Sequence, residues 1–325
     1  MDGPETLYIE PTNRCNLACT TCPRTFFPQE APRDLSLDEF QAILDQVPTA
    51  RRLVLHGVGE PLLHPNLPEL VQEARDRGLD VLFNTNAQLL TLSLGKALSR
   101  AGLGELRVSL DAPVDEAYGR VRKGGSLAAV TENLRRFRSW QIDNGVELPK
   151  LSLGMTEGRD RLPFLTKLVE LGAELGIPEV YLQRLVVLGT GDATRGEATY
   201  NRLSEAEEAL LEGAEVRAHE LGVLLRGSGN RSGDHLHQRN GNRRPWTECR
   251  RPYMATYITV HGNVLPCCIA PFSAPLALEE CTFANIFESP FDAIWDGPLY
   301  REFREKFASD NPPVCCRDCG TWWSL

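Results

Sequence analysis

The sequence predicts an α/β fold built on a parallel sheet, and three observations predict it. Strand-like apolar segments alternate with helix-like segments six times between residues 7 and 221, as is typical of parallel strands joined by right-handed crossovers. The strand-like segments are nearly continuous in apolar residues, as in the run from Tyr181 to Val187, which suits a sheet covered by helices. Helix-start signals precede several helices, and Ser204 with Glu207 has the spacing of a capping box.

The six expected units follow one another in order. The first strand leads into a cysteine-rich loop, Ser36 is expected to cap the first long helix, and Gly78 is expected to end the second. The expected strands are 7–10, 53–55, 80–83, 106–110, 148–153 and 180–187, and the expected helices are 37–47, 67–77, 92–101, 115–140, 162–175 and 204–221. Six units could form a flat doubly wound sheet or a curved partial barrel, and in both cases ligands bind at the carboxyl ends of the strands.

Length and composition favour one large domain with an appendage. The chain has 325 residues, a formal charge of −9 and 42% hydrophobic residues, which is ordinary for a globular protein. The acidic balance argues against a nucleic-acid or membrane surface, and no apolar run could span a bilayer. Met1 to Glu5 lack the features of a signal peptide, so we expect a cytoplasmic protein. We expect a core over 1–226, a flexible linker over 227–245 and a second domain over 246–325.

The cysteines form two groups, one near each end of the chain. Ten cysteines without an export signal point to metal or redox chemistry rather than to disulfides. Cys15, Cys19 and Cys22 form a C-x3-C-x2-C run directly after the first strand-like segment. Three thiolates on one loop can hold three irons of a cubane cluster and leave the fourth iron open, whereas most 4Fe–4S sites use four cysteines. The alternatives are a fortuitous cluster and a zinc knuckle, although zinc sites usually pair two C-x2-C knuckles or add histidines, and none lies near this run.

This cysteine run after a strand resembles that of the radical S-adenosylmethionine (SAM) superfamily. The resemblance implies a partial (β/α)6 TIM-like barrel, with a 4Fe–4S cluster on Cys15, Cys19 and Cys22 whose open iron binds SAM. Reductive cleavage of SAM would then give a 5′-deoxyadenosyl radical that abstracts hydrogen from a substrate. One departure concerns Thr21, because the family usually has an aromatic or large apolar residue there that packs against adenine.

Three strand ends carry segments similar to the SAM-binding segments of the superfamily. Residues 57–61 resemble the Gly-Gly-Glu-Pro segment that contacts the amino group of SAM, with valine in place of its first glycine. Residues 84–87 resemble Thr-Asn-Gly, and 109–112 resemble Ser-Leu-Asp-Gly, whose serine can bond the SAM carboxylate or ribose. Arg122 could clamp that carboxylate or be a solvated arginine on a helix. The implied cofactor-binding residues are Gly57, Gly59, Glu60, Thr85, Asn86, Ser109 and Arg122.

The C-terminal cysteines predict a second metal site. Cys249 and Cys267 flank a hairpin that turns at His261 and Gly262, and a helix over 291–307 precedes a C-x2-C knuckle. Four thiolates could close one 4Fe–4S cluster or build a zinc site. The pattern resembles the SPASM/twitch appendage of radical SAM enzymes and fits the shorter twitch form with one cluster. The implied ligands are Cys249, Cys267, Cys316 and Cys319.

Three further cysteines leave alternatives open. Cys268 and Cys315 adjoin the implied ligands, so either could take its neighbour's place. Cys281 is expected to be a buried thiol, and a contact with substrate is the alternative.

Three classes of function follow from these motifs. The first is a radical SAM oxidoreductase or maturase, in which the second cluster takes an electron from the substrate radical in a net oxidation. Its substrate would be a carbohydrate or aminocyclitol, or a peptide or protein, and its reductant a donor such as flavodoxin or ferredoxin. Residues 7–12 and 57–65 also look like segments of proposed maturases of tungsten-containing oxidoreductases. The second class is a redox-neutral epimerase or lyase with Cys281 or Cys268 as hydrogen donor, and the third is a non-catalytic iron–sulfur or zinc scaffold.

Overall fold

A single sheet organises the protein. The computed structural model describes residues 3–27, 30–199, 203–227, 246, 249–317 and 319. Within them ten strands form one sheet in the order β10-β9-β8-β1-β2-β3-β4-β5-β6-β7. The strands are β1 (Thr6–Ile9), β2 (Arg52–Leu55), β3 (Asp80–Thr85), β4 (Glu105–Ser109), β5 (Lys150–Thr156), β6 (Glu179–Gln183), β7 (Leu224–Gly227), β8 (Ala255–Ile258), β9 (Asn263–Leu265) and β10 (Ala284–Asn285). Pairing is parallel from β8 through β1 to β7, and antiparallel between β8 and β9 and between β9 and β10.

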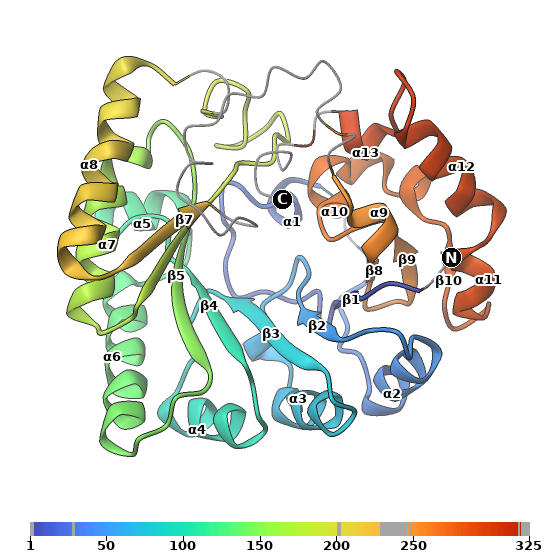
Figure 1. Ribbon diagram of the computed structural model, residues 1–325, viewed down its shortest axis with the longest axis horizontal. Helices are drawn as coiled ribbons and strands as arrows, with labels where there is room; N and C mark the ends of the chain where they lie inside the picture. Colours follow the sequence, from blue (N-terminus) through green and yellow to red (C-terminus); the bar gives the residue numbers. More distant parts are fainter. Residues whose placement is uncertain are drawn as a thin grey trace.

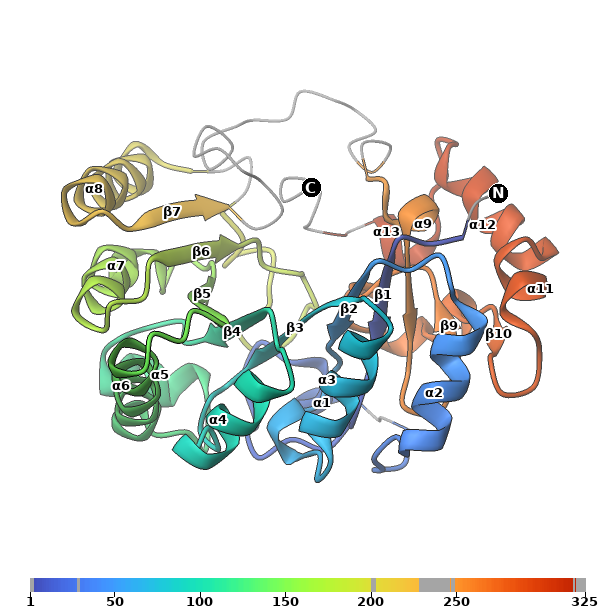
Figure 2. The same ribbon diagram turned by 60° about the horizontal axis from the view of Figure 1, so that its bottom comes forward.

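The order of the strands is that of a barrel. Strands β1 to β7 lie side by side in the order of the sequence, whereas a doubly wound sheet reverses its order at a switch point. The sheet curves, and α3, α4, α6, α7 and α8 cover its outer face (Figures 1 and 2). It stays open, because β10 and β7 are its edges. The expected partial barrel is therefore confirmed.

Thirteen α-helices lie in the described residues. They are α1 (Pro23–Phe26), α2 (Leu37–Gln46), α3 (Leu67–Asp76), α4 (Leu92–Arg100), α5 (Asp115–Val121), α6 (Leu127–Asp143), α7 (Leu165–Glu174), α8 (Glu205–Leu221), α9 (Arg251–Met254), α10 (Ala270–Ser273), α11 (Phe291–Trp295), α12 (Pro298–Phe307) and α13 (Val314–Arg317). Short 3₁₀ turns occur at Pro61–Leu63, Leu162–Phe164, Pro275–Ala277 and Glu279–Cys281. No helix of this part of the chain is both long and apolar enough to cross a bilayer.

The predicted helix starts are confirmed. Ser36 accepts from the backbone N–H of Glu39 at 3.2 Å, and the Glu39 carboxylate accepts from the Ser36 N–H at 2.9 Å. Ser204 and Glu207 form the same reciprocal pair at α8. Gly78 follows α3 with a φ of +83°, a conformation that favours glycine.

The structure corrects several boundaries. The expected helix over 115–140 is two helices, α5 and α6, separated at Gly124, where φ is +90°. The expected helix over 291–307 is also two, α11 and α12. A Cβ on Gly297 would lie 2.4 Å from the carbonyl oxygen of Ala293, and the following proline has no N–H to continue a helix. The sixth strand, expected over 180–187, ends at Gln183. Strands β7 and β10 were not predicted from the sequence.

The C-terminal segment joins the barrel through β1. Strand β8 pairs with β1 in parallel, with Ile9 opposite Ile258, and the expected hairpin is present as β8 and β9. One hydrophobic core runs through both parts and includes Leu7, Tyr257 and Trp295, each at most 1% exposed. The division into domains at 226 and 246 stays a prediction, and residues 228–245 of the expected linker lie outside the described residues.

Candidate active site and metal centres

A cavity of about 180 Å³ opens at the carboxyl ends of the parallel strands. Its walls come from the cysteine loop after β1, from the ends of β2 to β6, and from Ile269 and Phe272 at α10. The ten residues that the sequence assigned to the first cluster and to SAM all line this one cavity, namely Cys15, Cys19, Cys22, Gly57, Gly59, Glu60, Thr85, Asn86, Ser109 and Arg122. Residues spread over more than 100 positions are thus brought together, because parallel strands end at the same edge of a sheet.

The cysteine loop folds back on itself at the cavity. The N–H of Cys22 donates to the carbonyl of Cys19 at 3.2 Å, and α1 begins immediately after Cys22. Arg24 donates to the carbonyls of Cys15 and Leu17 at 3.3 and 2.5 Å. Burial raises the pKa of all three thiols, that of Cys22 to about 12, so metal binding would have to displace their protons. In the described part of the chain, no three His, Cys, Asp or Glu side chains are grouped as a single metal ion would require.

Glu60 is the centre of a buried hydrogen-bond network. One carboxylate oxygen accepts from the Thr85 hydroxyl at 2.6 Å and from the N–H of Leu62 at 3.0 Å, and the other accepts from the N–H of Asn86 at 2.7 Å. The Asn86 side chain donates to Asn16 on the cysteine loop at 2.9 Å. Thr85 and Asn86 therefore hold the β2 loop, residues 57–60, against β3 and the cysteine loop.

The two glycines of the β2 loop are required by close packing. A Cβ on Gly57 would lie 2.2 Å from a carboxylate oxygen of Glu10, and a Cβ on Gly59 would lie 2.0 Å from the carbonyl oxygen of Thr12. Neither distance is possible for real atoms, so only glycine lets this loop approach the chain around the cysteines.

Arg122 is buried and faces the cavity. It is 9% exposed and pairs with Asp111 at 2.8 Å, so the alternative of a solvated arginine is wrong. Asp111 has a φ of +64° and also accepts from the N–H of Thr156 at 2.8 Å. The sequence analysis assigned no role to Asp111, although this residue lies in segment 109–112, which resembles Ser-Leu-Asp-Gly. A non-glycine residue in this conformation is typical of a functional site, but the conformation is visible only in the structure.

The rim beyond β6 supplies apolar and charged groups that the sequence did not assign. Leu185 and Val186 line the cavity together with Thr21. The following segment packs on the cysteine loop, since Asp192 donates its N–H to the carbonyl of Thr20 at 3.0 Å. Arg184 also lines the cavity and forms a buried ion pair with Glu157.

The four expected ligands of the second site all lie in the C-terminal part, but in the described residues no three of them are grouped as one metal ion would require. The thiols near Cys267 include Cys268 and Cys315 as well as Cys319 and Cys249, and those near Cys316 include Cys315, Cys267, Cys319 and Cys249, so the choice between each expected ligand and its adjacent cysteine stays open. Burial raises the pKa of the Cys267 thiol well above its ordinary value. Segments more than 60 residues apart in the sequence thus contribute thiols to the same part of the structure, and their assignment to a second cluster stays a prediction.

The remaining cysteines lie away from the cavity wall. Cys281 is 1% exposed, and its thiol is hydrogen-bonded to that of Cys315. Cys268 is 6% exposed and its thiol is hydrogen-bonded to the hydroxyl of Tyr8. Neither of the two thiols considered as hydrogen donors lines the cavity.

Comparison with known protein families finds two matches. The model of the radical SAM superfamily matches residues 9–156, and the model of the SPASM iron–sulfur cluster-binding domain matches residues 249–320. These two ranges contain every cysteine of the chain.

Three characterised relatives show the range of related proteins. An AdoMet-dependent heme synthase of Methanosarcina barkeri is 26% identical over 94% of this chain and 86% of its own length. A PqqA peptide cyclase of Gluconobacter oxydans is 28% identical over 97% of this chain and 82% of its own. A tungsten-containing aldehyde ferredoxin oxidoreductase cofactor-modifying protein of Pyrococcus furiosus is 29% identical over 56% of this chain, which spans only 52% of that relative.

A solved structure shares the fold. The crystal structure of Streptococcus suis SuiB bound to S-adenosylmethionine matches 98% of this chain and 73% of SuiB, with a TM-score of 0.68 and 17% identity.

Proposed function

Because the chain belongs to the radical SAM superfamily and carries a C-terminal SPASM-type domain, we propose that it is an oxidoreductase or maturase that uses SAM to remove hydrogen from its substrate. One observation gives this proposal its strongest support. The three cysteines of the N-terminal run and the SAM-like segments of three strands line the same cavity.

The residues present fit a 4Fe–4S cluster with one open iron beside SAM. Cys15, Cys19 and Cys22 would hold the cluster, and when bound the cluster and SAM would supply the electron and the radical that starts the reaction. The β2 loop would receive the amino group of SAM. Glu60, fixed by three hydrogen bonds, keeps this loop in place, and Arg122, which is paired with Asp111, would present a cation to the SAM carboxylate.

The second thiol group fits a role in net oxidation. Cys249, Cys267, Cys316 and Cys319 would ligate a cluster completely, which leaves electron transfer as its use. Phe272, five residues after Cys267 in the sequence, lines the cavity, which supports a position of the second centre near the reaction site. A redox-neutral epimerase is less well supported, since Cys281 and Cys268 do not line the cavity.

A peptide or a cofactor precursor is better supported as the substrate class than a carbohydrate. Relatives that span nearly the whole chain include a peptide cyclase and a heme synthase, and a cofactor-modifying protein matches 56% of this chain. We propose a substrate of one of these two classes and an external one-electron donor such as flavodoxin or ferredoxin.

The test is metal content together with SAM cleavage. Anaerobically reconstituted protein should carry about eight irons and eight sulfides, and with dithionite and SAM it should release 5′-deoxyadenosine. The matched control is Cys281→Ser, which changes a buried thiol outside both proposed ligand sets and should retain both properties. Absence of 5′-deoxyadenosine from iron-loaded protein would refute the proposed reaction, and four irons with one zinc would refute the electron-transfer role of the second centre.

A further inference from the structure

Glu10 joins the SAM side of the protein to the C-terminal hairpin. It follows β1 and is 2% exposed. One carboxylate oxygen accepts from the backbone N–H of Val58 in the β2 loop at 2.8 Å, and the other accepts from the N–H of Val260 in the β8–β9 turn at 3.2 Å. The hydroxyl of Tyr257 on β8 is also hydrogen-bonded to this carboxylate. A single buried side chain therefore connects the carboxyl ends of β1, β2 and β8.

The β2 loop is pressed directly against this carboxylate. Gly57 leaves no room for a Cβ beside Glu10, and Gly59 leaves none beside Thr12. The position of the loop is thus set by the Glu10 carboxylate on one side and by the cysteine loop on the other. Since this loop carries Glu60 and would receive the SAM amino group, a change at Glu10 reaches the SAM site without touching the ligand.

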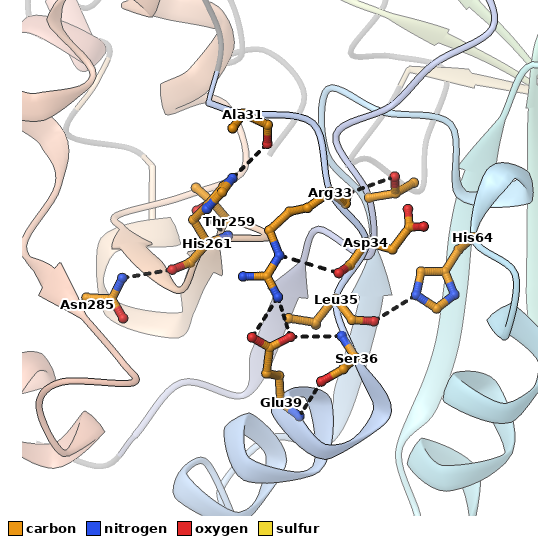
Figure 3. A network of polar contacts seen from close by, with 11 residues as sticks. Ala31, Arg33, Asp34, Leu35, Ser36, Glu39, His64, Thr259, His261 and Asn285 are labelled. Atoms are coloured by element: carbon orange, nitrogen blue, oxygen red, sulfur yellow. Dashed lines mark hydrogen bonds and ion pairs between the residues drawn. The ribbon is translucent and has the colours of Figure 1, made fainter.

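The hairpin end of the link is held firmly in place. His261 lies within 2.8 Å of the carbonyl oxygen of Ala31, and Asn285 donates to the carbonyl of His261 at 2.8 Å (Figure 3). Asn263 donates to the Glu30 carboxylate at 2.5 Å. The turn that contains the Val260 N–H is therefore fixed from two sides. Because the turn is fixed, we expect it to set the position of the Glu10 carboxylate, which in turn sets the position of the β2 loop.

We propose that Glu10 is a positioning residue through which the C-terminal hairpin sets the SAM-binding loop, and that the ionised form of Glu10 is the one that supports tight SAM binding. The inference rests on the proposed function, because it takes the cavity to be the SAM site. An ionised carboxylate accepts from both backbone N–H groups, and charge-assisted bonds are roughly twice as strong as neutral ones. A protonated carboxyl turns one oxygen into a donor and weakens one of the two links.

The surroundings of Glu10 bring this change into the neutral pH range. Burial, with a smaller effect of the Glu30 carboxylate, raises the pKa of Glu10 to about 7, although the N–H groups of Val58 and Val260 and the Tyr257 hydroxyl lower it. The small cavity beside Glu10 is otherwise lined by uncharged residues, namely Asn13, Val58, Thr259, Pro271, Pro275 and Leu278. Affinity for SAM should therefore increase as pH rises through 7.

The test measures the dissociation constant of SAM for the anaerobically reconstituted full chain between pH 6 and pH 8.5. We expect the affinity of the wild type to rise on the order of tenfold over this range. Glu10→Gln should bind more weakly at pH 8 and should lose this rise, with its iron content unchanged. The amino group of SAM also titrates, at about 8, but it contributes equally to both proteins, so the difference between them isolates Glu10. Glu5→Gln, an exposed glutamate just before β1, is the matched control and should follow the wild type.

A second variant keeps the inference testable where Glu10→Gln does not fold. Tyr257→Phe removes a donor to the carboxylate, which raises the pKa of Glu10 further and should move the midpoint of the SAM-affinity profile to higher pH. An unchanged profile in either variant would overturn the role of Glu10 while leaving the proposed function intact. Failure of the iron-loaded wild type to bind SAM at any pH would instead remove the proposed function.

Discussion

The imidazole of His56 stacks on the ring of Phe272, with ring centroids 5.9 Å apart and planes inclined by 13°. His56 directly follows β2, and Phe272 lies on α10, a few residues after Cys267 and Cys268. Both residues line the cavity. One wall of the candidate active site is thus built from both halves of the chain.

This stack predicts a pH-dependent stability. Burial, helped by the charge of Arg107, lowers the pKa of His56 to about 4. Between pH 6.5 and 4 the unfolded chain binds a proton at this site and the folded protein does not, so the stabilisation present above pH 6.5 is lost as pH falls. His56→Phe retains the stack and cannot titrate. Relative to this variant, the wild type should lose about 2 kcal/mol of unfolding free energy between pH 7.5 and pH 5, measured by denaturant titration.

The comparison with His56→Phe is needed because Glu10 acts in the opposite direction. The raised pKa of Glu10 means that its proton is held more tightly in the folded state, so its contribution to stability falls as pH rises from 4.5 to 7. Equal pH slopes for the wild type and His56→Phe would show that His56 does not titrate as its surroundings imply.

The two thiol groups should lose metal independently. Cys22→Ser should remove about four irons and abolish SAM cleavage, whereas Cys316→Ser should also remove about four irons but leave reductive SAM cleavage in place. The reason is spatial, since only the first thiol group lines the cavity. Iron analysis and chromatography of 5′-deoxyadenosine measure both outcomes. Complete loss of iron from Cys316→Ser would contradict the assignment to two separate centres.

Arg122 should support both SAM binding and stability. Arg122→Gln leaves the buried Asp111 carboxylate without its cation, which should cost about 3 kcal/mol of unfolding free energy. SAM affinity should fall at least about tenfold through the loss of a charge-assisted contact. Arg120→Gln is the matched control, because Arg120 lies on α5 two residues before Arg122, is exposed and pairs with Asp160 at the surface. Similar behaviour of the two variants would exclude a specific role for Arg122.

Gly59→Ala should damage the first site selectively. The added Cβ would collide with the carbonyl of Thr12, so the β2 loop must move away from the cysteine loop. We expect reduced SAM affinity with the second centre still loaded. Gly119→Ala provides the comparison, since a Cβ at this position of α5 meets no atom within 4 Å and should stabilise the protein by about 0.5 to 1 kcal/mol. Wild-type SAM affinity in Gly59→Ala would contradict the close packing of the loop.

Sequence reasoning succeeded where the signal is local. Ser36 with Glu39 and Ser204 with Glu207 form their capping pairs within one helical turn, so their spacing is sufficient to predict them. It failed at Gly297, where the break between α11 and α12 reflects both the crowding at this glycine and the missing N–H of Pro298. It also missed β7, a four-residue strand recognised only by its pairing with β6.

The sequence by itself determined the alternation of strands and helices, the three-cysteine run and the two groups of thiols, because periodicity and spacing are properties of the chain alone. Only the tertiary structure decided that Glu10 bonds both Val58 and Val260, that Asp111 pairs with Arg122, and that Phe272 meets His56. These relationships depend on which strand ends meet at one edge of the curved sheet and on how far each side chain reaches. Neither can be derived from the sequence alone.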